Sequence, residues 1–261
     1  MSDTLPTLWH IDVSHFSEKA RWALVYKGVE HRRRAVPPGA HIPTALFLTR
    51  GEHKTFPVLT LDGRNIGDST AVIAALEQQY PEPPLYPEDT EERRKAVQLE
   101  EFFDEELGPY VRHLSFYELQ QDPELFEALI ERTAPGPLAK VPAVTAAYTR
   151  TFLQLRWSAA DGSAVEVDRE KIVAAFDRID DLLAAGGGDY LVGDSFSVAD
   201  LTAASLLNPL VLPNGGPLPS DAPQPKGMAG FLAPLEERPA FAWVEETYRR
   251  HRKPAAINAP A

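Results

Sequence analysis

The 261-residue chain contains no cysteine. This absence excludes disulfide bonds, thiolate metal sites and redox chemistry at a protein thiol. Any sulfur chemistry at this protein must therefore use a sulfur that arrives with a ligand. The sequence also has no internal repeat, no phosphate-cradling glycine-rich loop and no HExxH motif, and its seven histidines are scattered, so we expect no metal site.

A long apolar run is missing as well. A helix needs about 20 predominantly apolar residues to span a bilayer, and no stretch of this chain approaches that length. The first residues, Met1 to Thr7, show no basic segment followed by an apolar one, so we see no secretory signal. We therefore expect a cytoplasmic protein that does not bind membranes and is long enough for one large or two ordinary domains.

Basic residues are too few for a nucleic-acid binder. The formal net charge is -12, whereas nucleic-acid binding normally requires a basic face. The charge is uneven: 9 Lys and Arg face 8 Asp and Glu up to Tyr80, and 17 face 30 in the remainder. We therefore expect an anionic ligand to be tolerated far better by the first segment than by the second.

The most informative stretch runs from Thr7 to Leu24, TLWHIDVSHFSEKARWAL. It begins with the alternating apolar pattern of a half-buried strand. At Ser14 the period becomes helical, because the following apolar residues recur at the spacing of one helix face. A strand that turns into a helix in this way exposes backbone N–H groups at a helix N-terminus, which favours anion binding.

Ser14 and Ser17 in this turn have two readings. Serine is among the residues preferred as helix caps, for reasons unrelated to chemistry. Alternatively, one hydroxyl points out of the turn and stabilises a bound thiolate by donating a hydrogen bond to it. The residues of the turn do not decide between the two readings.

The rest of the first 80 residues predicts one more strand, a loop, a hairpin and a helix. Arg32 to Arg34 lie on the predicted second strand, where we favour a solvated edge over a phosphate site. The Asp62-Gly63 pair favours a tight hairpin turn. The expected segments, in chain order, are a strand over Glu30 to Val36, a loop over Pro37 to Arg50 with one helical turn at Thr44 to Leu48, strands over Val58 to Leu61 and Arg64 to Ile66, and a helix beginning at Asp68-Ser69.

A proline-rich connector, Pro81 to Pro87, separates this part from a helical remainder, so we predict domains at residues 1–80 and 88–261. Ser197 and Asp200 have the spacing of a capping box and predict a helix start. Asn208 to Pro225 reads as a long loop, either a lid or an insertion, and the last residues, KPAAINAPA, as a disordered tail. The predicted helices cover Glu91 to Leu107, with Val97 on its apolar stripe, Pro123 to Glu131, Ala143 to Trp157, Glu170 to Ala185, the segment after Ser197, and Ala240 to His251.

The segment SHFSEKARWAL, Ser14 to Leu24, resembles the first active-site turn of cytosolic glutathione transferases of the Ser/Cys type. In that family Ser or Cys opens a C/S-P-F-x-x-[KR]-x-R-x-x-L pattern, and here His15 replaces the commoner proline. Lys19 and Arg21 match the family's basic positions. A second match is Gly193 to Asp200, which resembles the G-D-x-x-S-x-A-D start of the family's buried helix. The resemblance implies a thioredoxin-like α/β domain followed by an all-helical domain.

The same resemblance implies a glutathione site. Ser14 takes the catalytic position, and Pro57 matches a cis proline that turns the backbone of Phe56 toward the cysteinyl part of glutathione. Asp68 and Ser69 match the acidic-Ser pair that holds the γ-glutamyl end. Lys54 lies where the family often has a residue for the glycyl carboxylate, although neighbouring His53 and Thr55 compete for that role.

The implied function is that of a glutathione S-transferase that detoxifies a small apolar electrophile by alkyl or aryl transfer. Ser14 would favour the glutathione thiolate, which then attacks the second substrate, and the protein would be a homodimer without a metal. Aromatic residues of the helical domain such as Tyr110, Phe116, Tyr117 or Trp157 are candidates for the second substrate's cleft, although core packing explains each of them as well. Two alternatives stay open: a glutathione-dependent isomerase or dehalogenase, and a binding or scaffold protein that keeps the fold, with another low-molecular-weight thiol as a possible ligand.

Overall fold

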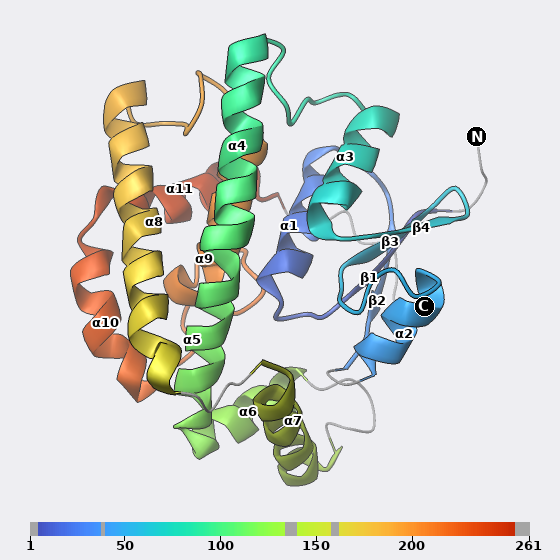
Figure 1. The fold of residues 1–261 in the computed structure, drawn as a ribbon, viewed down its shortest axis with the longest axis vertical. Coiled ribbons are helices and arrows are strands. Elements are labelled where there is room, and N and C mark those ends of the chain that lie inside the picture. Colours follow the sequence, from blue (N-terminus) through green and yellow to red (C-terminus); the bar gives the residue numbers. More distant parts are fainter. Residues whose placement is uncertain (1–4, 38–39, 134–139, 158–161, 254–261) are drawn as a thin grey trace.

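A four-stranded sheet flanked by helices forms the first part of the chain in a computed structural model (Figure 1). The model describes residues 5–37, 40–133, 140–157 and 162–253. The elements of this part are β1 (Thr7–His10), α1 (His15–Tyr26), β2 (Arg32–Ala35), α2 (His41–Leu48), β3 (Val58–Leu61), β4 (Arg64–Gly67) and α3 (Ser69–Gln79).

The strand order is β2-β1-β3-β4, with β1 parallel to β2 and antiparallel to β3. β2 is therefore an edge strand, as its run of arginines predicts, and the guanidinium of Arg34 lies 4.9 Å from the ring centroid of Trp9. β3 and β4 form the predicted hairpin, whose turn residues Asp62 and Gly63 have φ of 48° and 77°. This conformation suits the tight turn that an Asp-Gly pair favours.

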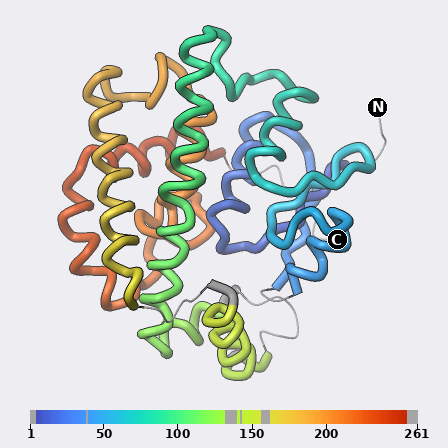
Figure 2. Tube along the Cα trace, viewed as in Figure 1, coloured from blue at the N-terminus to red at the C-terminus, as the bar shows by residue number. Residues whose placement is uncertain are grey.

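The remainder of the chain is helical, and Figure 2 shows it as the green to red part of the trace beside the blue and cyan sheet domain. Residues 80–89, between α3 and α4, form no helix or strand, and we propose that the two domains divide there. Its elements are α4 (Thr90–Glu106), α5 (Gly108–Gln120), α6 (Pro123–Thr133), α7 (Pro142–Trp157), η2 (Gly162–Ala164), α8 (Val165–Gly186), α9 (Val198–Val211), α10 (Lys226–Glu236) and α11 (Pro239–His251). The fold is a thioredoxin-like domain followed by a helical domain, as the sequence predicts.

Helix α9 is the centre of the helical domain, because nearly all of its residues are buried. Its predicted capping box is confirmed: Oδ2 of Asp200 accepts hydrogen bonds from the backbone N–H and the hydroxyl of Ser197, at 2.9 Å and 2.8 Å. Oδ1 of Asp200 also accepts from the N–H of Leu191, at 2.8 Å. Burial raises the pKa of Asp200 to about 6. Ser197 and Asp200 therefore hold the fold together rather than line a site.

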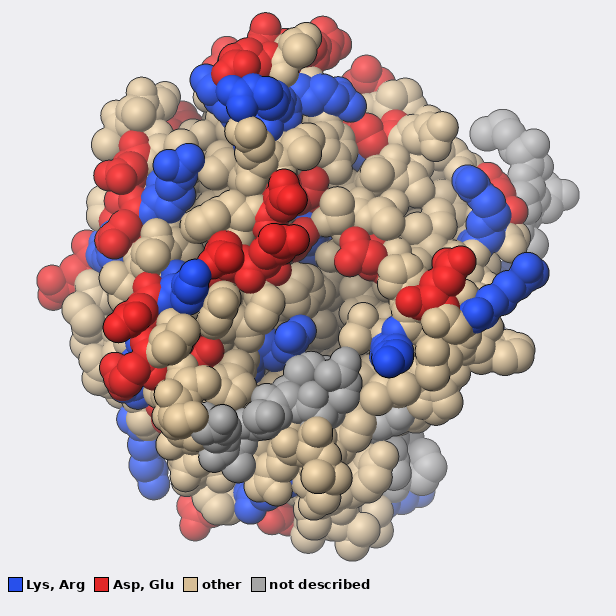
Figure 3. Space-filling model, in the orientation of Figure 1, with Lys and Arg blue, Asp and Glu red and all other residues tan. Residues whose placement is uncertain are grey.

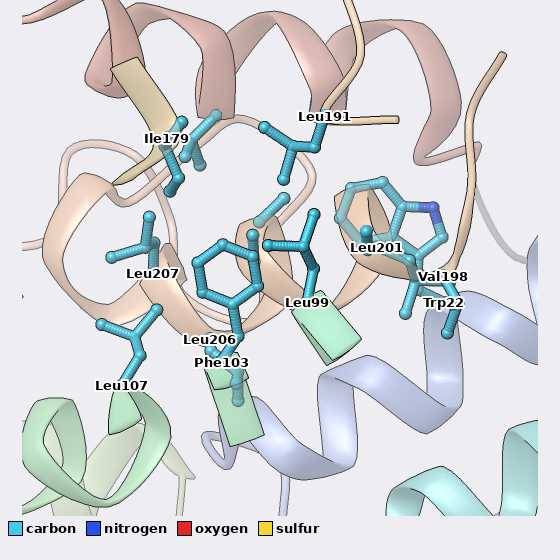
Figure 4. Packing of buried hydrophobic residues seen from close by; sticks show 14 of the residues in the cluster. Trp22, Leu99, Phe103, Leu107, Ile179, Leu191, Val198, Leu201, Leu206 and Leu207 are labelled. Atoms are coloured by element: carbon cyan, nitrogen blue, oxygen red, sulfur yellow. The ribbon is translucent and has the colours of Figure 1, made fainter. Parts of the chain in front are cut away.

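Helix α1 joins the two domains. Trp22 is fully buried and lies among α9 residues and neighbouring side chains of the helical domain (Figure 4). Its ring centroid is 4.3 Å from that of Tyr248 and 5.7 Å from that of Phe196. The element that begins at Ser14 is thus packed between the sheet and the helical domain.

Three predictions about secondary structure are wrong. The segment Pro37 to Arg50, predicted as a loop with one helical turn, contains the longer helix α2, because Pro43 lies in its first turn, where a missing N–H is tolerated. The loop predicted from Asn208 begins only after Val211. Pro209 cannot donate to the carbonyl of Ser205, but Nδ2 of Asn208 donates to that oxygen at 2.5 Å, so the helix continues.

Helix α10 is absent from the prediction, since its glycines and Pro234 hide the helical pattern. Val97, placed on the apolar stripe of α4, is 43% exposed instead. The predicted disordered tail after Lys253 lies outside the described residues.

Candidate active site

The turn between β1 and α1 places Ser14 at the N-cap of α1. Ser14 has an extended backbone, with φ of -77° and ψ of 125°, and its Oγ accepts a hydrogen bond from the N–H of Ser17 at 3.2 Å. The capping role is therefore confirmed. Among the described residues the O–H of Ser14 has no acceptor, so the same hydroxyl keeps its hydrogen for a ligand.

Ser17 has a structural role in this turn. It is fully buried, and its Oγ accepts a hydrogen bond from the N–H of Ile11 at 3.3 Å. Its own N–H is the group that Ser14 caps. Ser17 thus fixes the shape of the loop around Ser14 and is not in contact with a ligand cavity.

Phe56 and Pro57 are joined by a cis peptide bond, as the resemblance implies. Both residues are buried, and Phe56 packs in a small core with Ala45 and Val58 below the sheet. Thr55 and Phe56 line the large cavity described below, whereas Pro57 does not.

Asp68 and Ser69 begin helix α3. Asp68 has φ of 74°, and its Oδ1 accepts hydrogen bonds from the N–H groups of Thr70 and Ala71 at 2.9 Å and 3.1 Å. Its Oδ2 and the hydroxyl of Ser69 have no hydrogen-bond partner within the described ranges. Asp68 is exposed and Ser69 is buried, and neither lines the large cavity. As at Ser14, the capping bonds leave two polar groups for a ligand, Oδ2 of Asp68 and the hydroxyl of Ser69.

Lys54 is exposed and lies on the loop before Phe56, outside the walls of the large cavity. His53 is half-buried, and its backbone is tied to the hydroxyl of Thr49, which accepts from the N–H of His53 at 2.9 Å. Because the side chain of Lys54 is exposed, its ammonium is accessible to a ligand.

A cavity of about 620 Å³ opens beside Ser14. Its walls come from both domains: the β1-α1 turn, the start of α2 and the loop at Thr55 on one side, and α5, α6, α7 and the segment 212–228 on the other. Most of its lining is apolar. Figure 3 shows acidic side chains gathered over α4 on one face of the molecule, and a hollow beside them between the helices and the sheet domain.

The structure describes the side chains of three of the four aromatic residues predicted for the second substrate's cleft. Phe116 lines the cavity, whereas Tyr110 and Tyr117 pack against the main core. The side chain of Trp157 lies outside the described part of the structure.

His15, which replaces the family's usual proline, is buried beside Ser14 and lines the cavity. Burial, aided by the positive charge of Arg112, lowers the pKa of His15 to about 3, so the imidazole is neutral at physiological pH. Its ring makes a hydrogen bond to the backbone of Gly108, and Nε2 has no partner among the described residues. The bond to Gly108 therefore uses Nδ1.

Lys19 and Arg21 do not reach the cavity. Nζ of Lys19 lies 2.6 Å from Oδ2 of Asp104 and 2.9 Å from Oε1 of Glu100, both on α4. Arg21 pairs with Glu18 at 2.7 Å. Lys19 therefore links α1 to the helical domain, whereas Arg21 is paired within α1.

Sequence patterns predicted little of the cavity wall that the helical domain contributes, apart from Phe116 and part of the segment from Asn208. Arg112 and Ser115 line the cavity from α5. Residues 212–225, the part of the predicted Asn208 to Pro225 lid or insertion that follows α9, supply a further part of the wall. The one sequence signal for this part of the wall is that Arg112 lies among apolar residues of the helical pattern. Which face of α5 meets the sheet domain depends on tertiary packing.

Within the described residues, no three His, Asp or Glu side chains are placed to hold a metal ion. None of the described helices has the length and apolar character needed to cross a membrane.

Comparison with known proteins gives matches over most of the chain. The model of the glutathione S-transferase N-terminal domain matches residues 8–84, and that of the glutathione S-transferase C-terminal domain matches residues 146–246. A curated relative, the maleylacetoacetate isomerase of Dictyostelium discoideum, is 27% identical over 77% of each chain.

Two solved structures are similar in fold. A glutathione transferase from Phanerochaete chrysosporium has a TM-score of 0.66 and 18% identity, covering 98% of this chain and 100% of that one. A glutathione S-transferase from Methylobacterium radiotolerans, in complex with glutathione sulfonate, has a TM-score of 0.55 and 23% identity. The match covers 99% of this chain and 100% of that one.

Proposed function

The chain belongs to the glutathione S-transferase family, and from this premise we propose that it binds glutathione and activates its thiol with Ser14 for attack on a small apolar electrophile. The observation that carries the proposal is the unused O–H of Ser14 at the N-terminus of α1, beside the cavity. A hydroxyl that already accepts its capping bond can still donate its hydrogen to a sulfur.

The polar atoms left over in the sheet domain match the charges of glutathione. Oδ2 of Asp68 suits an ammonium group, and the hydroxyl of Ser69 at the start of α3 suits a carboxylate. Lys54 carries an exposed ammonium for the other carboxylate. The backbone of Phe56 lies between these groups in the chain and would hold the cysteinyl part.

Bound glutathione supplies the nucleophilic sulfur. Ser14 donates a hydrogen bond to that sulfur, and the α1 N-terminus adds a partial positive charge, so the thiolate is favoured over a thiol whose ordinary pKa is about 8.5. Ser14 acts as a donor and not as a base, so the thiol proton leaves to solvent. The apolar walls of the cavity hold the second substrate near Ser14 and exclude water from it.

Glutathione binding measured by calorimetry and conjugation of an aryl halide test this role. The Ser14→Ala variant should lose about tenfold or more in kcat/KM, since a hydrogen bond to a charged group contributes about 1.5–3 kcal/mol. It should also raise the pKa of the bound thiol, which ultraviolet absorbance of the thiolate reports. Ser220→Ala is the control, because Ser220 is exposed and does not line the cavity, and it should leave that pKa unchanged. Equal rates and equal thiol pKa values for wild type and Ser14→Ala would remove Ser14 from the mechanism.

An isomerase that recycles glutathione is the second candidate, and the isomerase names of relatives such as the Dictyostelium protein favour it. The same Ser14 and the same cavity would serve it. Net consumption of glutathione separates the two, because a transferase consumes one molecule per turnover and an isomerase or a dehalogenase that regenerates it does not. A scaffold protein would bind without turnover.

We also propose a homodimer in the cytoplasm. Membership of the family supports the dimer, since glutathione S-transferases are generally dimeric. Sedimentation of the purified protein at micromolar concentration as a single monomeric species would contradict the dimer.

A further inference from the structure

One corner of the large cavity is polar although most of its wall is apolar. Among the described lining residues, only Asp12 and Arg112 carry a formal charge. The side chain of Asp12 is 53% exposed, so its charge is largely in solvent. Arg112 is half-buried, and its guanidinium lies 5.7 Å from the ring centroid of Phe16. The cavity thus holds one sheltered cation, close to the turn that carries Ser14.

Arg112 lies on a face of α5 that lines the cavity. Ser115, Phe116 and Leu119 follow it at the spacing of one helix face, and all four residues line the cavity. The Oγ of Ser115 is shielded from solvent and has no hydrogen-bond partner in the described ranges. Serine in a helix often bonds the carbonyl four residues earlier, and Ser115 does not. Its hydroxyl is therefore left for a group in the cavity.

His15 provides a second unpartnered polar atom near Arg112. It is only 5% exposed, and Nε2 has no partner among the described residues. Because the ring is neutral, it does not cancel the charge of Arg112, and the lone pair on Nε2 cannot compete for an anion. Among the described lining residues, the formal positive charge in this corner is therefore that of Arg112.

We propose that Arg112 and Ser115 form a carboxylate subsite in the cavity, so that the second substrate is an apolar electrophile carrying one carboxylate. This inference rests on the proposed function and names its substrate class. The planar guanidinium matches a carboxylate with two parallel hydrogen bonds, and the Ser115 hydroxyl adds a third donor. A phosphate would bring a second negative charge against apolar walls, which disfavours it.

A matched pair of electrophiles tests the subsite: a chlorodinitrobenzoate and its methyl ester. Wild type should show a KM for the acid about tenfold or more below that for the ester, the ratio expected from one charge-assisted hydrogen-bonded pair. Arg112→Met should abolish this preference while the ester keeps its rate within about twofold. Arg112→Lys should restore part of the preference, because it returns the charge without the planar pair of donors.

Arg150→Met is the control variant. Arg150 also lies over a phenyl ring, 5.2 Å from the ring centroid of Phe126, but it does not line the cavity. Its removal should leave the acid-to-ester ratio unchanged. Ser115→Ala should reduce the ratio severalfold, and it keeps the test decisive if Arg112→Met does not fold. Equal KM values for acid and ester in wild type, or equal losses for both in Arg112→Met, would overturn the subsite.

Binding of an unreactive analogue separates this inference from the proposed function. A methyldinitrobenzoate, in which methyl replaces chlorine, and its ester are titrated by calorimetry against wild type and Arg112→Met. A preference for the acid that depends on Arg112, without conjugation of either chloro compound, would support the subsite and reject the transferase. Conjugation of both compounds without any binding preference would support the transferase and reject the subsite.

Discussion

Replacing Lys19 by methionine gives the sharpest test of how the two domains are held together. Lys19 is fully buried on α1, and its Nζ lies within ion-pair distance of Glu100 and Asp104 on α4. It also donates to the hydroxyl of Thr70 at 2.8 Å, at the start of α3. Methionine keeps an apolar side chain of similar length but leaves the two carboxylates without their cation.

The expected loss follows from the burial of these carboxylates. The side chain of Glu100 is 3% exposed and that of Asp104 is 19% exposed. Removing one partner of a buried ion pair destabilises a protein by about 3–5 kcal/mol, because the remaining charge has neither water nor a partner. For a chain of this size that corresponds to a fall in Tm of roughly 6 to 20 °C. Denaturation with urea, followed by circular dichroism, measures the free energy of unfolding.

Two variants make this test specific. Lys171 on α8 forms an ion pair with Glu106 on α4, and both side chains are exposed, by 40% and 41%. Lys171→Met should therefore have little effect, since an exposed pair contributes little. The double variant Lys19→Met/Glu100→Gln should lose less free energy of unfolding than the sum of the losses of the two single variants. The difference, the coupling energy, should be about 1 kcal/mol or more. A loss below about 1 kcal/mol for Lys19→Met, or an equal loss for Lys171→Met, would refute the reasoning.

Two further predictions concern the surroundings of Ser14. Gly108→Ala should destabilise the protein by about 1–3 kcal/mol, as overpacking does, because the added Cβ would lie 2.5 Å from the ring of Phe16. Gly186→Ala, where nothing lies within 4 Å, should not destabilise it, and equal losses in urea denaturation would contradict this packing argument. Burial holds the pKa of His15 at about 3, below its ordinary 6.5, so the unfolded chain takes up a proton as the pH is lowered from about 6.5 to 3, and the free energy of unfolding decreases as the pH is lowered through that window. For each pH unit of acidification in this window, the free energy of unfolding of wild type should decrease by up to about 1.4 kcal/mol more than that of His15→Gln. Parallel curves of this free energy against pH would contradict a buried neutral imidazole.

Local signals predicted the elements that carry the thiol side of the site. The change of period at Ser14, the Asp62-Gly63 turn and the Ser197-Asp200 capping box each depend on a few neighbouring residues. Such features form in the structure as the sequence indicates. The atoms that Ser14 uses for capping and the hydrogen that it keeps are both visible once the turn is folded.

Other features depend on side-chain contacts that the sequence pattern does not show. Pro209 looks like a helix breaker until Nδ2 of Asn208 is seen to occupy the carbonyl that the proline leaves. Lys19 looks like a solvated helix residue until α4 packs against it. The cavity face of α5, with Arg112 and Ser115, exists only because two domains meet there. Periodicity in a single helix does not show which face meets another domain.

The burial of Trp22 against the helical domain limits how this protein could be divided or recombined. A gene fragment that encodes only the sheet half would produce a molecule with an indole ring and an unpaired Lys19 on its surface, prone to aggregate. The sheet half is therefore not a module that evolution or an engineer can transplant alone. Exchange of the segment 212–225, which forms an outer wall of the cavity, is the safer route to a new specificity.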